Sequence, residues 1–187
     1  MAGHNKWTQI KRKKGVADQK RSKLFSMLAR AITLESKKAA GNKDSPSLKK
    51  AVELARKENM PNDNIDRAIA KGTGAGAESF EEVTYEAYGP GGAALIIEGM
   101  TDSRNRTNAE IKHILTDGGG SMGTPGSALW AFTKTADGWE PNMLMALSED
   151  DNEKLIALLE KIDDHDDVKA VFTNADLPEE PDGEPVL

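Results

Sequence analysis

The hydrophobic pattern of this 187-residue chain changes from a helical period to a strand period near residue 72. Before that point, apolar residues recur at helical spacing in three segments, near 18–40, 46–59 and 61–71. In the first segment the stripe includes Leu24 and Leu28. Because such stripes are stable only when buried against one another, these segments predict a three-helix bundle.

Helix-breaking residues separate the three predicted helices. Gly41-Asn42 should end the first helix. Ser45 followed by Pro46 is the N-cap and first position expected of a second helix. Met60-Pro61 should break the second helix and open the third, which Gly72 should end.

A glycine-rich linker leads into segments with a strand period. Residues 83–88 alternate between an apolar face and a polar face that includes Glu86, and 93–97 are continuously apolar. With the turn residues Gly89–Gly92 between them, they predict a β-hairpin. The segments expected after the hairpin are a helix over 107–116, a Gly-rich loop over 118–127, strands over 128–133 and 142–147, a helix opened by a capping pattern from Ser148 to Asp151, and a strand over 168–173.

These elements predict an α+β protein of two domains. A basic arm and three-helix bundle come first, followed by a domain of order β-β-α-β-β-α-β. The predicted divisions are a basic helical domain at 1–71, a linker at 72–79, an acidic α+β domain at 80–176 and a disordered acidic tail at 177–187.

The charge of the chain is divided at the same place as its periodicity. Residues 1–71 hold 18 of the 25 Lys and Arg but only 7 of the 31 Asp and Glu, a net charge of +11, whereas residues 72–187 carry −17. A basic module beside an acidic body is typical of proteins that bind polyanions. Ordinary solvation of a charged face is the competing explanation, but the local excess is too one-sided for it, so nucleic acid is the expected partner.

The candidate nucleic-acid contacts come from the arm and the helices. Lys and Arg neutralise phosphates and release counterions, and an aromatic side chain in the arm could stack on an exposed base. Duplex DNA and ribosomal RNA are both polyanions, so the composition leaves both open, and a ribosome is a further candidate partner. The predicted contact residues are Lys6, Trp7, Lys11, Arg12, Lys13, Lys14, Lys20, Arg21, Lys23, Arg30, Lys37, Lys38, Arg56, Lys57 and Arg67.

A second anion site is conceivable at the polar connection 101–107. Arg104 and Arg106 lie beside the start of the helix predicted at 107–116, and a helix N-terminus attracts anions. The alternative is a polar connection that only caps the helix.

Signals for catalysis, metal binding and membrane insertion are poor. The chain has no Cys and three His without ligand spacing, and no nucleophile–base pair can be identified. Asp163–Asp167, which includes His165, could attract a cation but is more typical of a charged loop. We therefore expect a non-enzyme without metal or cofactor. No apolar run is long enough for a membrane span, so a cytoplasmic protein is expected, and a monomer is favoured.

Several long motifs stand in one order along the chain: Met1–His4, Lys6-Trp7, Ile10-Lys11, Lys20–Phe25, Asn59–Pro61, Asn64–Ile69, Tyr85–Gly92, Thr101–Thr107 and Asn174–Asp176. They resemble the YebC/PmpR family, which includes the mitochondrial translational activator of cytochrome oxidase. The resemblance implies a cytoplasmic DNA-binding transcriptional regulator. Other members of the family resemble translation factors that relieve ribosomes stalled at proline-rich stretches.

One segment departs from the family pattern. Family members carry a helical domain and two α/β domains, the third inserted in the second, but only 14 residues lie between Phe132 and Leu147. The third domain is therefore expected to be absent near 133–146. The functions expected from the sequence are a DNA-binding transcriptional regulator, alternatively a ribosome-associated translation factor, and alternatively a non-catalytic protein-interaction module.

Overall fold

The computed structural model describes residues 17–74, 79–136 and 138–177. Within these residues the chain forms two compact units. We call them the helical unit, which holds the described residues up to 82 and also 100–104, and the sheet unit, which holds 83–99 and the described residues from 105 onward. The predicted α+β class and two-domain layout are confirmed, whereas the predicted domain boundaries stay predictions.

The helical unit contains the predicted three-helix bundle. Its helices are α2 at Ala17–Lys38, α3 at Pro46–Lys57 and α4 at Asn62–Thr73. Their apolar stripes meet in one core, to which each helix contributes fully or nearly fully buried side chains. Leu24, expected in the buried stripe of the first helix, is instead 40% exposed. The core residues are Leu28, Ile32, Leu48, Ala55, Met60, Ile65 and Ala68.

The helix boundaries follow the predicted breakers with two differences. Ser45 is the N-cap of α3 and Pro46 its first residue, but the Ser45 side chain makes no capping hydrogen bond. Gly72, predicted to end the third helix, lies inside α4, which continues to Thr73. Residues 75–78 of the predicted linker lie outside the described residues.

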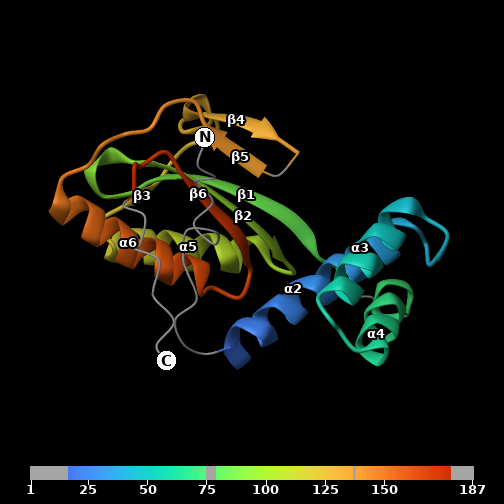
Figure 1. Ribbon diagram of the computed structural model, residues 1–187. Helices are drawn as coiled ribbons and strands as arrows, with labels where there is room; N and C mark the ends of the chain where they lie inside the picture. The colour runs from blue at the N-terminus through green and yellow to red at the C-terminus, as the bar shows by residue number, and fades with distance from the viewer. Residues whose placement is uncertain (1–16, 75–78, 137, 178–187) are drawn as a thin grey trace. The chain divides into compact units, whose positions relative to one another are not determined.

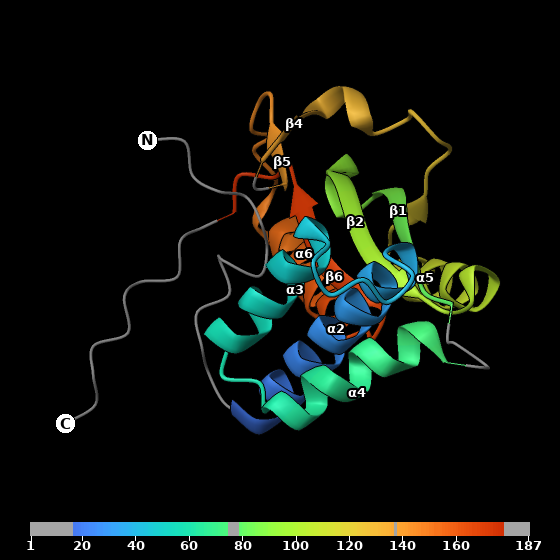
Figure 2. The same cartoon turned by 90° about the vertical axis from the view of Figure 1, so that its right-hand side faces the viewer.

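Gly72 allows α4 to approach α2 closely (Figure 2). A Cβ at Gly72 would lie 2.5 Å from the carbonyl oxygen of Thr33 and 3.0 Å from the backbone nitrogen of Lys37. Two hydroxyls of α2 also donate to α4 carbonyls: Thr33 Oγ1 to Ala68 O at 3.0 Å, and Ser36 Oγ to Ile69 O at 2.8 Å. Gly72 is therefore required for close packing of the two helices.

The sheet unit is built on a four-stranded sheet with the order β3-β1-β2-β6. Its long strands are β1 at Glu81–Tyr88, β2 at Ala94–Thr101 and β6 at Val168–Thr173. The predicted hairpin strands β1 and β2 are neighbours, and β2 pairs antiparallel with β6, with Ile96 opposite Phe172. The central strand β2 is almost entirely buried, as its continuous apolar run predicted.

The two faces of this sheet are covered by different elements (Figure 1). The helices α5 at Arg104–Asp117 and α6 at Glu149–Asp163 cover one face, where they form the main core with side chains of β2 and β6. On the opposite face, Ile96 and Phe172 pack against Ala128, Ala131 and Phe132. The predicted capping residue Ser148 accepts a hydrogen bond from Asp151 N at the start of α6.

Several predicted elements of this unit differ from the observed ones. A 3₁₀ helix, η2 at Leu129–Ala131, precedes β4 at Phe132–Thr135, so the strand predicted at 128–133 is shifted. The partner of β4 is β5 at Gly138–Pro141. The strand predicted at 142–147 is wrong, because Met143 and Leu144 are 74% and 50% exposed and only Met145 forms a bridge, to Ala175.

Two further boundaries were missed. The segment predicted as a Gly-rich loop contains a short strand, β3 at Ser121–Met122, which pairs with the end of β1. The helix predicted to begin at Thr107 begins three residues earlier, at Arg104. Of the predicted disordered tail only Leu177 is described, and it packs against the main core.

Glu86 of β1 is buried, although the alternation placed it on the polar face. It is 8% exposed, and its carboxylate accepts hydrogen bonds from the backbone N–H groups of Gly126, Ala128 and Leu129. Burial alone would raise the pKa of Glu86, but the three N–H donors outweigh it, so the pKa is lowered from 4.5. The carboxylate thus fixes the loop before β4 onto the sheet.

Candidate nucleic-acid interface

Part of the predicted interface lies outside the described residues. The helix α2 includes Lys20, but its side chain is likewise not described. The arm residues outside the description are Lys6, Trp7, Lys11, Arg12, Lys13 and Lys14.

Most of the other predicted cations lie exposed on the helical unit. Arg56 and Lys57 are at the C-terminal end of α3, and neither forms an ion pair with another described residue. On α2, Arg21 lies 5.7 Å from the ring centroid of Phe25, and Lys23 is half-buried.

Lys37 and Lys38, at the end of α2, have partners of different charge. Lys37 Nζ lies 2.9 Å from Ser79 Oγ, a neutral partner. Lys38 Nζ donates to Glu35 Oε1 at 2.8 Å, and this hydrogen bond raises the pKa of Lys38. Burial alone would raise the pKa of Glu35, but the hydrogen bonds from Lys38 and Ser47 outweigh it and lower that pKa. Lys38 is therefore paired with a carboxylate within the helical unit, whereas the partner of Lys37 is neutral.

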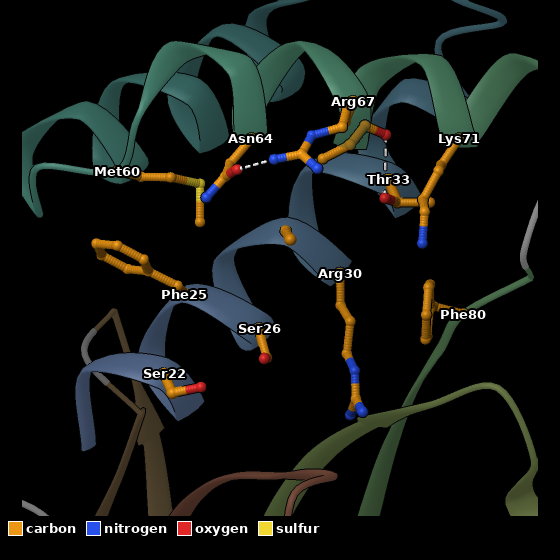
Figure 3. Close-up of a pocket in the computed structure, with 12 residues that line it drawn as sticks. Ser22, Phe25, Ser26, Arg30, Thr33, Met60, Asn64, Arg67, Lys71 and Phe80 are labelled. Atoms are coloured by element: carbon orange, nitrogen blue, oxygen red, sulfur yellow. Dashed lines mark hydrogen bonds between the residues drawn. The ribbon is translucent and has the colours of Figure 1, made fainter. Parts of the chain in front are cut away.

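A hollow of about 590 Å³ lies between α2 and α4, and Arg30 and Arg67 both line it (Figure 3). Lys71, which the sequence analysis did not select, lies beside them. The described residues that line the hollow include no carboxylate and no histidine. The lining residues are Ser22, Phe25, Ser26, Ala29, Arg30, Thr33, Met60, Asn64, Arg67, Ala68, Lys71 and Phe80.

Helical spacing places the polar lining residues of each helix on one face. Ser22, Ser26 and Arg30 of α2 follow one another at intervals of four, the spacing of neighbours on a helix surface. Arg67 and Lys71 of α4 are also four residues apart. This spacing was visible in the sequence, but only the packing of α4 against α2 shows that the two faces meet.

Two cations of the hollow, Arg67 and Arg30, donate hydrogen bonds to neutral groups. Arg67 donates from Nε to the carbonyl oxygen of Asp63 at 3.2 Å and from Nη2 to the side-chain oxygen of Asn64. Arg30 donates from Nη1 to the carbonyl oxygen of Met100 at 3.1 Å, and its Cζ lies 5.5 Å from the ring centroid of Phe80. These bonds orient the two guanidinium groups, and the acceptors named here carry no charge.

The candidates for a second anion site, Arg104 and Arg106, both face carboxylates. Arg104 Nη2 lies 2.8 Å from Glu81 Oε2. Arg106 Nη2 lies 2.7 Å from Asp167 Oδ2, and its Nε lies 3.7 Å from Glu110 Oε2. An added anion would compete with these carboxylates, and the second anion site stays a prediction.

A cluster around His165 in the sheet unit contains potential metal ligands. Ligand-type atoms of Glu110, His165 and Asp167 lie within 4.8 Å of one another. His165 Nδ1 accepts from Asp167 N at 3.1 Å, so Nε2 carries the hydrogen that faces Glu110 Oε2 at 3.0 Å. Asp167 is buried and accepts from Thr107 Oγ1 at 2.6 Å as well as from Arg106. This network joins the start of α5 to the loop before β6.

Comparison with known proteins assigns the chain to a family. The model of the TACO1/YebC protein N-terminal domain matches residues 5–75, and that of the TACO1/YebC second and third domain matches 80–137. A probable transcriptional regulatory protein of Syntrophus aciditrophicus is 37% identical over 243 positions, which cover 96% of this chain and 97% of the relative. The chain belongs to the TACO1/YebC family. The resemblance seen in the sequence is thereby confirmed.

Two other proteins are also similar to this TACO1/YebC-family chain. A probable transcriptional regulatory protein of Chlorobaculum tepidum is 48% identical over 172 residues, which cover 89% of this chain and 67% of the relative. The crystal structure of a conserved hypothetical protein from Aquifex aeolicus matches with a TM-score of 0.82 and 30% identity, and covers 95% of this chain and 99% of that one.

The alignment with the Syntrophus relative is longer than this TACO1/YebC-family chain. A chain of 187 residues cannot fill 243 aligned positions, so the Syntrophus protein carries residues without a counterpart here. The match to the second and third domain model ends at residue 137. That the missing residues are an inserted third domain near 133–146 stays a prediction.

Proposed function

We propose that the protein is a nucleic-acid-binding regulator of gene expression, and first of all a DNA-binding regulator of transcription. The observation that carries this proposal is the hollow of the helical unit, which gathers three cations and no carboxylate among its described lining residues. The names of the Syntrophus and Chlorobaculum relatives, both probable transcriptional regulatory proteins, support the regulatory role.

Phosphate contacts would dominate the affinity. Each neutralised phosphate releases condensed counterions, so about six such contacts would weaken binding by about 10³ between 50 and 200 mM salt. Such contacts orient a protein on a nucleic acid but do not read its sequence. The basic arm and the exposed cations Arg21, Arg56 and Lys57 would add to the contacts made in the hollow.

A ribosome-associated translation factor is the second candidate. It is favoured by the contact of Arg30 with Phe80, because aromatic rings and guanidinium planes are surfaces on which the unpaired bases of RNA stack. In this role the protein would contact ribosomal RNA and relieve stalling at proline-rich stretches, as the family resemblance implied. A non-catalytic protein-interaction module is favoured only if no nucleic acid is bound.

The proposed role is non-catalytic, cytoplasmic and monomeric, with no cofactor. The non-catalytic part of this proposal is supported by the lining of the hollow, where the described residues offer no histidine or carboxylate as a general base. Separately, none of the helices in the described ranges has the length and apolar character required to cross a bilayer.

Binding of the full chain to duplex DNA and to purified ribosomes tests the proposal. We expect salt-sensitive binding that the paired change Arg67→Gln and Lys71→Gln weakens by about tenfold, since two phosphate contacts are lost. Fluorescence anisotropy at 50 and 200 mM salt measures this for DNA, and co-sedimentation at physiological salt measures it for ribosomes. Lys169→Gln, an exposed cation of β6, is the control and should bind as the unchanged protein does.

Binding to only one of the two ligands, duplex DNA or ribosomes, distinguishes the two candidate functions. Sedimentation with ribosomes and little duplex binding would favour the translation factor. Binding to neither ligand at 50 mM salt would overturn the proposed function.

A further inference from the structure

We propose that the hollow between α2 and α4 receives one unpaired nucleotide of a nucleic-acid strand. This inference rests on the proposed function and narrows its ligand, from a polyanion in general to a strand with an accessible base. The observations that carry it are the size of the hollow, the planar groups on its wall and the position of its cations.

The hollow has the dimensions of a small-molecule site rather than of a duplex groove. Its volume of about 590 Å³ falls in the range of about 300–1,000 Å³ that is typical of pockets for small molecules. The bases of a duplex are stacked inside the helix and cannot enter such a site unless one of them is turned out. An unpaired nucleotide can enter directly.

Planar groups for a base lie at both ends of the hollow. Figure 3 shows Phe25 and Met60 at one end, Phe80 and Lys71 at the other, and the Arg30 side chain beside Phe80. The guanidinium of Arg30 lies over the Phe80 ring, with 5.5 Å between Cζ and the ring centroid. Because a base stacks on an aromatic ring or a guanidinium plane, it can extend this pair.

The α4 wall supplies groups for the phosphate. The Arg67 guanidinium is oriented by two neutral acceptors, the carbonyl of Asp63 and the side chain of Asn64, so its charge remains available to a phosphate oxygen. Lys71 lies one helical turn further along the same wall. A phosphate between these two residues would leave its base on the side of Phe80 and Arg30.

The α2 wall supplies hydroxyls for the sugar or the base edge. Ser22 and Ser26 line the hollow one turn apart and are exposed, and a hydroxyl can both donate and accept a hydrogen bond. A hollow with cations alone would suit any anion. The combination of planar groups, hydroxyls and cations matches the three parts of a nucleotide.

An acidic peptide is the competing ligand. A peptide of Asp and Glu residues could bind Arg67 and Lys71 through its carboxylates, but it has no flat ring to place on Phe80 and Arg30. The two ligands therefore differ in whether the flat ring contributes to affinity, and the test is built on that difference.

The test compares two strands of equal charge with the full chain at low salt. One is a short oligothymidylate, and the other has the same backbone with every base replaced by an abasic residue. We expect the unchanged protein to bind the oligothymidylate about tenfold more tightly, because base–aromatic stacking contributes ~1–3 kcal/mol per base. In Phe80→Leu this preference should fall to about twofold, because the aromatic partner of the base is lost.

Matched variants separate stacking from charge. Lys57→Gln removes an exposed cation outside the lining of the hollow, so it should weaken both strands alike and preserve their ratio. Phe80→Tyr keeps a ring and should keep the preference. Circular dichroism and thermal unfolding show whether each variant is folded. The main comparison, between the two strands, uses the unchanged protein and so does not depend on any variant.

Each remaining outcome has a defined meaning. Equal affinity of the unchanged protein for both strands overturns the inference while leaving the proposed function intact. Displacement of the oligothymidylate by an acidic peptide of equal charge, at equal concentration, also overturns it. Competition by free thymidine monophosphate as strong as that of the strand would assign the site to free nucleotides instead. Failure to bind any nucleic acid refutes the proposed function itself.

Discussion

Two carboxylates of the sheet unit and two cations of the helical unit lie in opposite environments. In the sheet unit, Glu86 and Asp167 are 8% and 2% exposed, and each accepts several hydrogen bonds from groups far away in the sequence. In the helical unit, Arg67 and Lys71 are exposed on the wall of a hollow. The comparison shows buried charge that contributes to the fold in one unit and exposed charge, for which we propose a binding role, in the other.

The physical reason lies in the cost of burying an ion. A buried carboxylate without partners is strongly destabilising, so Glu86 and Asp167 are tolerated only because backbone, hydroxyl or guanidinium donors surround them. An exposed cation needs no partner, and its attraction for surface groups is weak. Changes in the two units should therefore have different consequences for stability and for binding.

The largest expected effect comes from Gly72→Val in α4. Its Cβ would lie 2.5 Å from the Thr33 carbonyl and 3.0 Å from the Lys37 nitrogen, both backbone atoms, so α2 and α4 must separate. We expect a loss of ~3 kcal/mol in the unfolding free energy of the helical unit. Far-UV circular dichroism during urea unfolding measures it, and nucleic-acid binding should fall in parallel.

Gly74→Ala is the matched control for this change. A Cβ at Gly74 would make an ordinary contact, 3.4 Å from the Ala70 carbonyl oxygen, at a backbone φ of −75°. Its stability should be close to that of the unchanged protein. A loss as large as that of Gly72→Val would show that the approach of the two helices is not the cause.

The next effect is expected from Glu86→Gln in the sheet unit. A glutamine side chain has only one acceptor oxygen, so the N–H groups of Gly126, Ala128 and Leu129 cannot all be satisfied. We expect a loss of ~2 kcal/mol. Tryptophan fluorescence during urea unfolding at pH 7 measures it, and unchanged nucleic-acid binding is expected, because the hollow belongs to the helical unit.

The same change should alter the dependence of stability on pH. Because folding lowers the pKa of Glu86 from 4.5, its contribution is fully present above that value and is lost as the pH falls toward the lowered pKa. The gap in unfolding free energy between the unchanged protein and Glu86→Gln should therefore narrow below pH 4.5. A gap that stays constant in acid would contradict the role of the ionised carboxylate.

The smallest effect is expected from Arg104→Gln. Its ion pair with Glu81 is exposed on both sides, with side-chain exposures of 61% and 49%, so we expect a loss of only ~0.5 kcal/mol or less. Nucleic-acid affinity should also change less than in Arg67→Gln, because Arg104 already faces a carboxylate. An equal loss of affinity in both variants would support the second anion site and contradict the expectation that a cation paired with a carboxylate contributes less to binding.

Local patterns predicted much of this fold. The helical stripes, the breaker at Met60-Pro61 and the continuous apolar run of β2 depend on neighbouring residues, and the elements follow them. The strand β3 was missed because its two residues lie among glycines and depend on β1 for their pairing. The false strand at 142–147 shows that apolar residues without a covering surface do not form a strand.

The candidate site was only partly predictable for the same reason. The excess of positive charge was evident, and it pointed to Arg30 and Arg67. Lys71 and Phe80 were missed because their place beside Arg30 depends on how α4 and the start of β1 return to α2. Glu86 was misplaced because a distant loop covers its side of the strand.

The two hydroxyl bonds from α2 to α4 have a consequence for any ligand of the helical unit. A slip of one helical turn would move α4 along α2 by about 5.4 Å. Such a slip would separate the hydroxyls of Thr33 and Ser36 from their carbonyl acceptors, although the two residues are only 2% and 0% exposed. The hydrogen bonds of these two small side chains therefore fix the register of α2 against α4, and with it the spacing between Arg30 and Lys71.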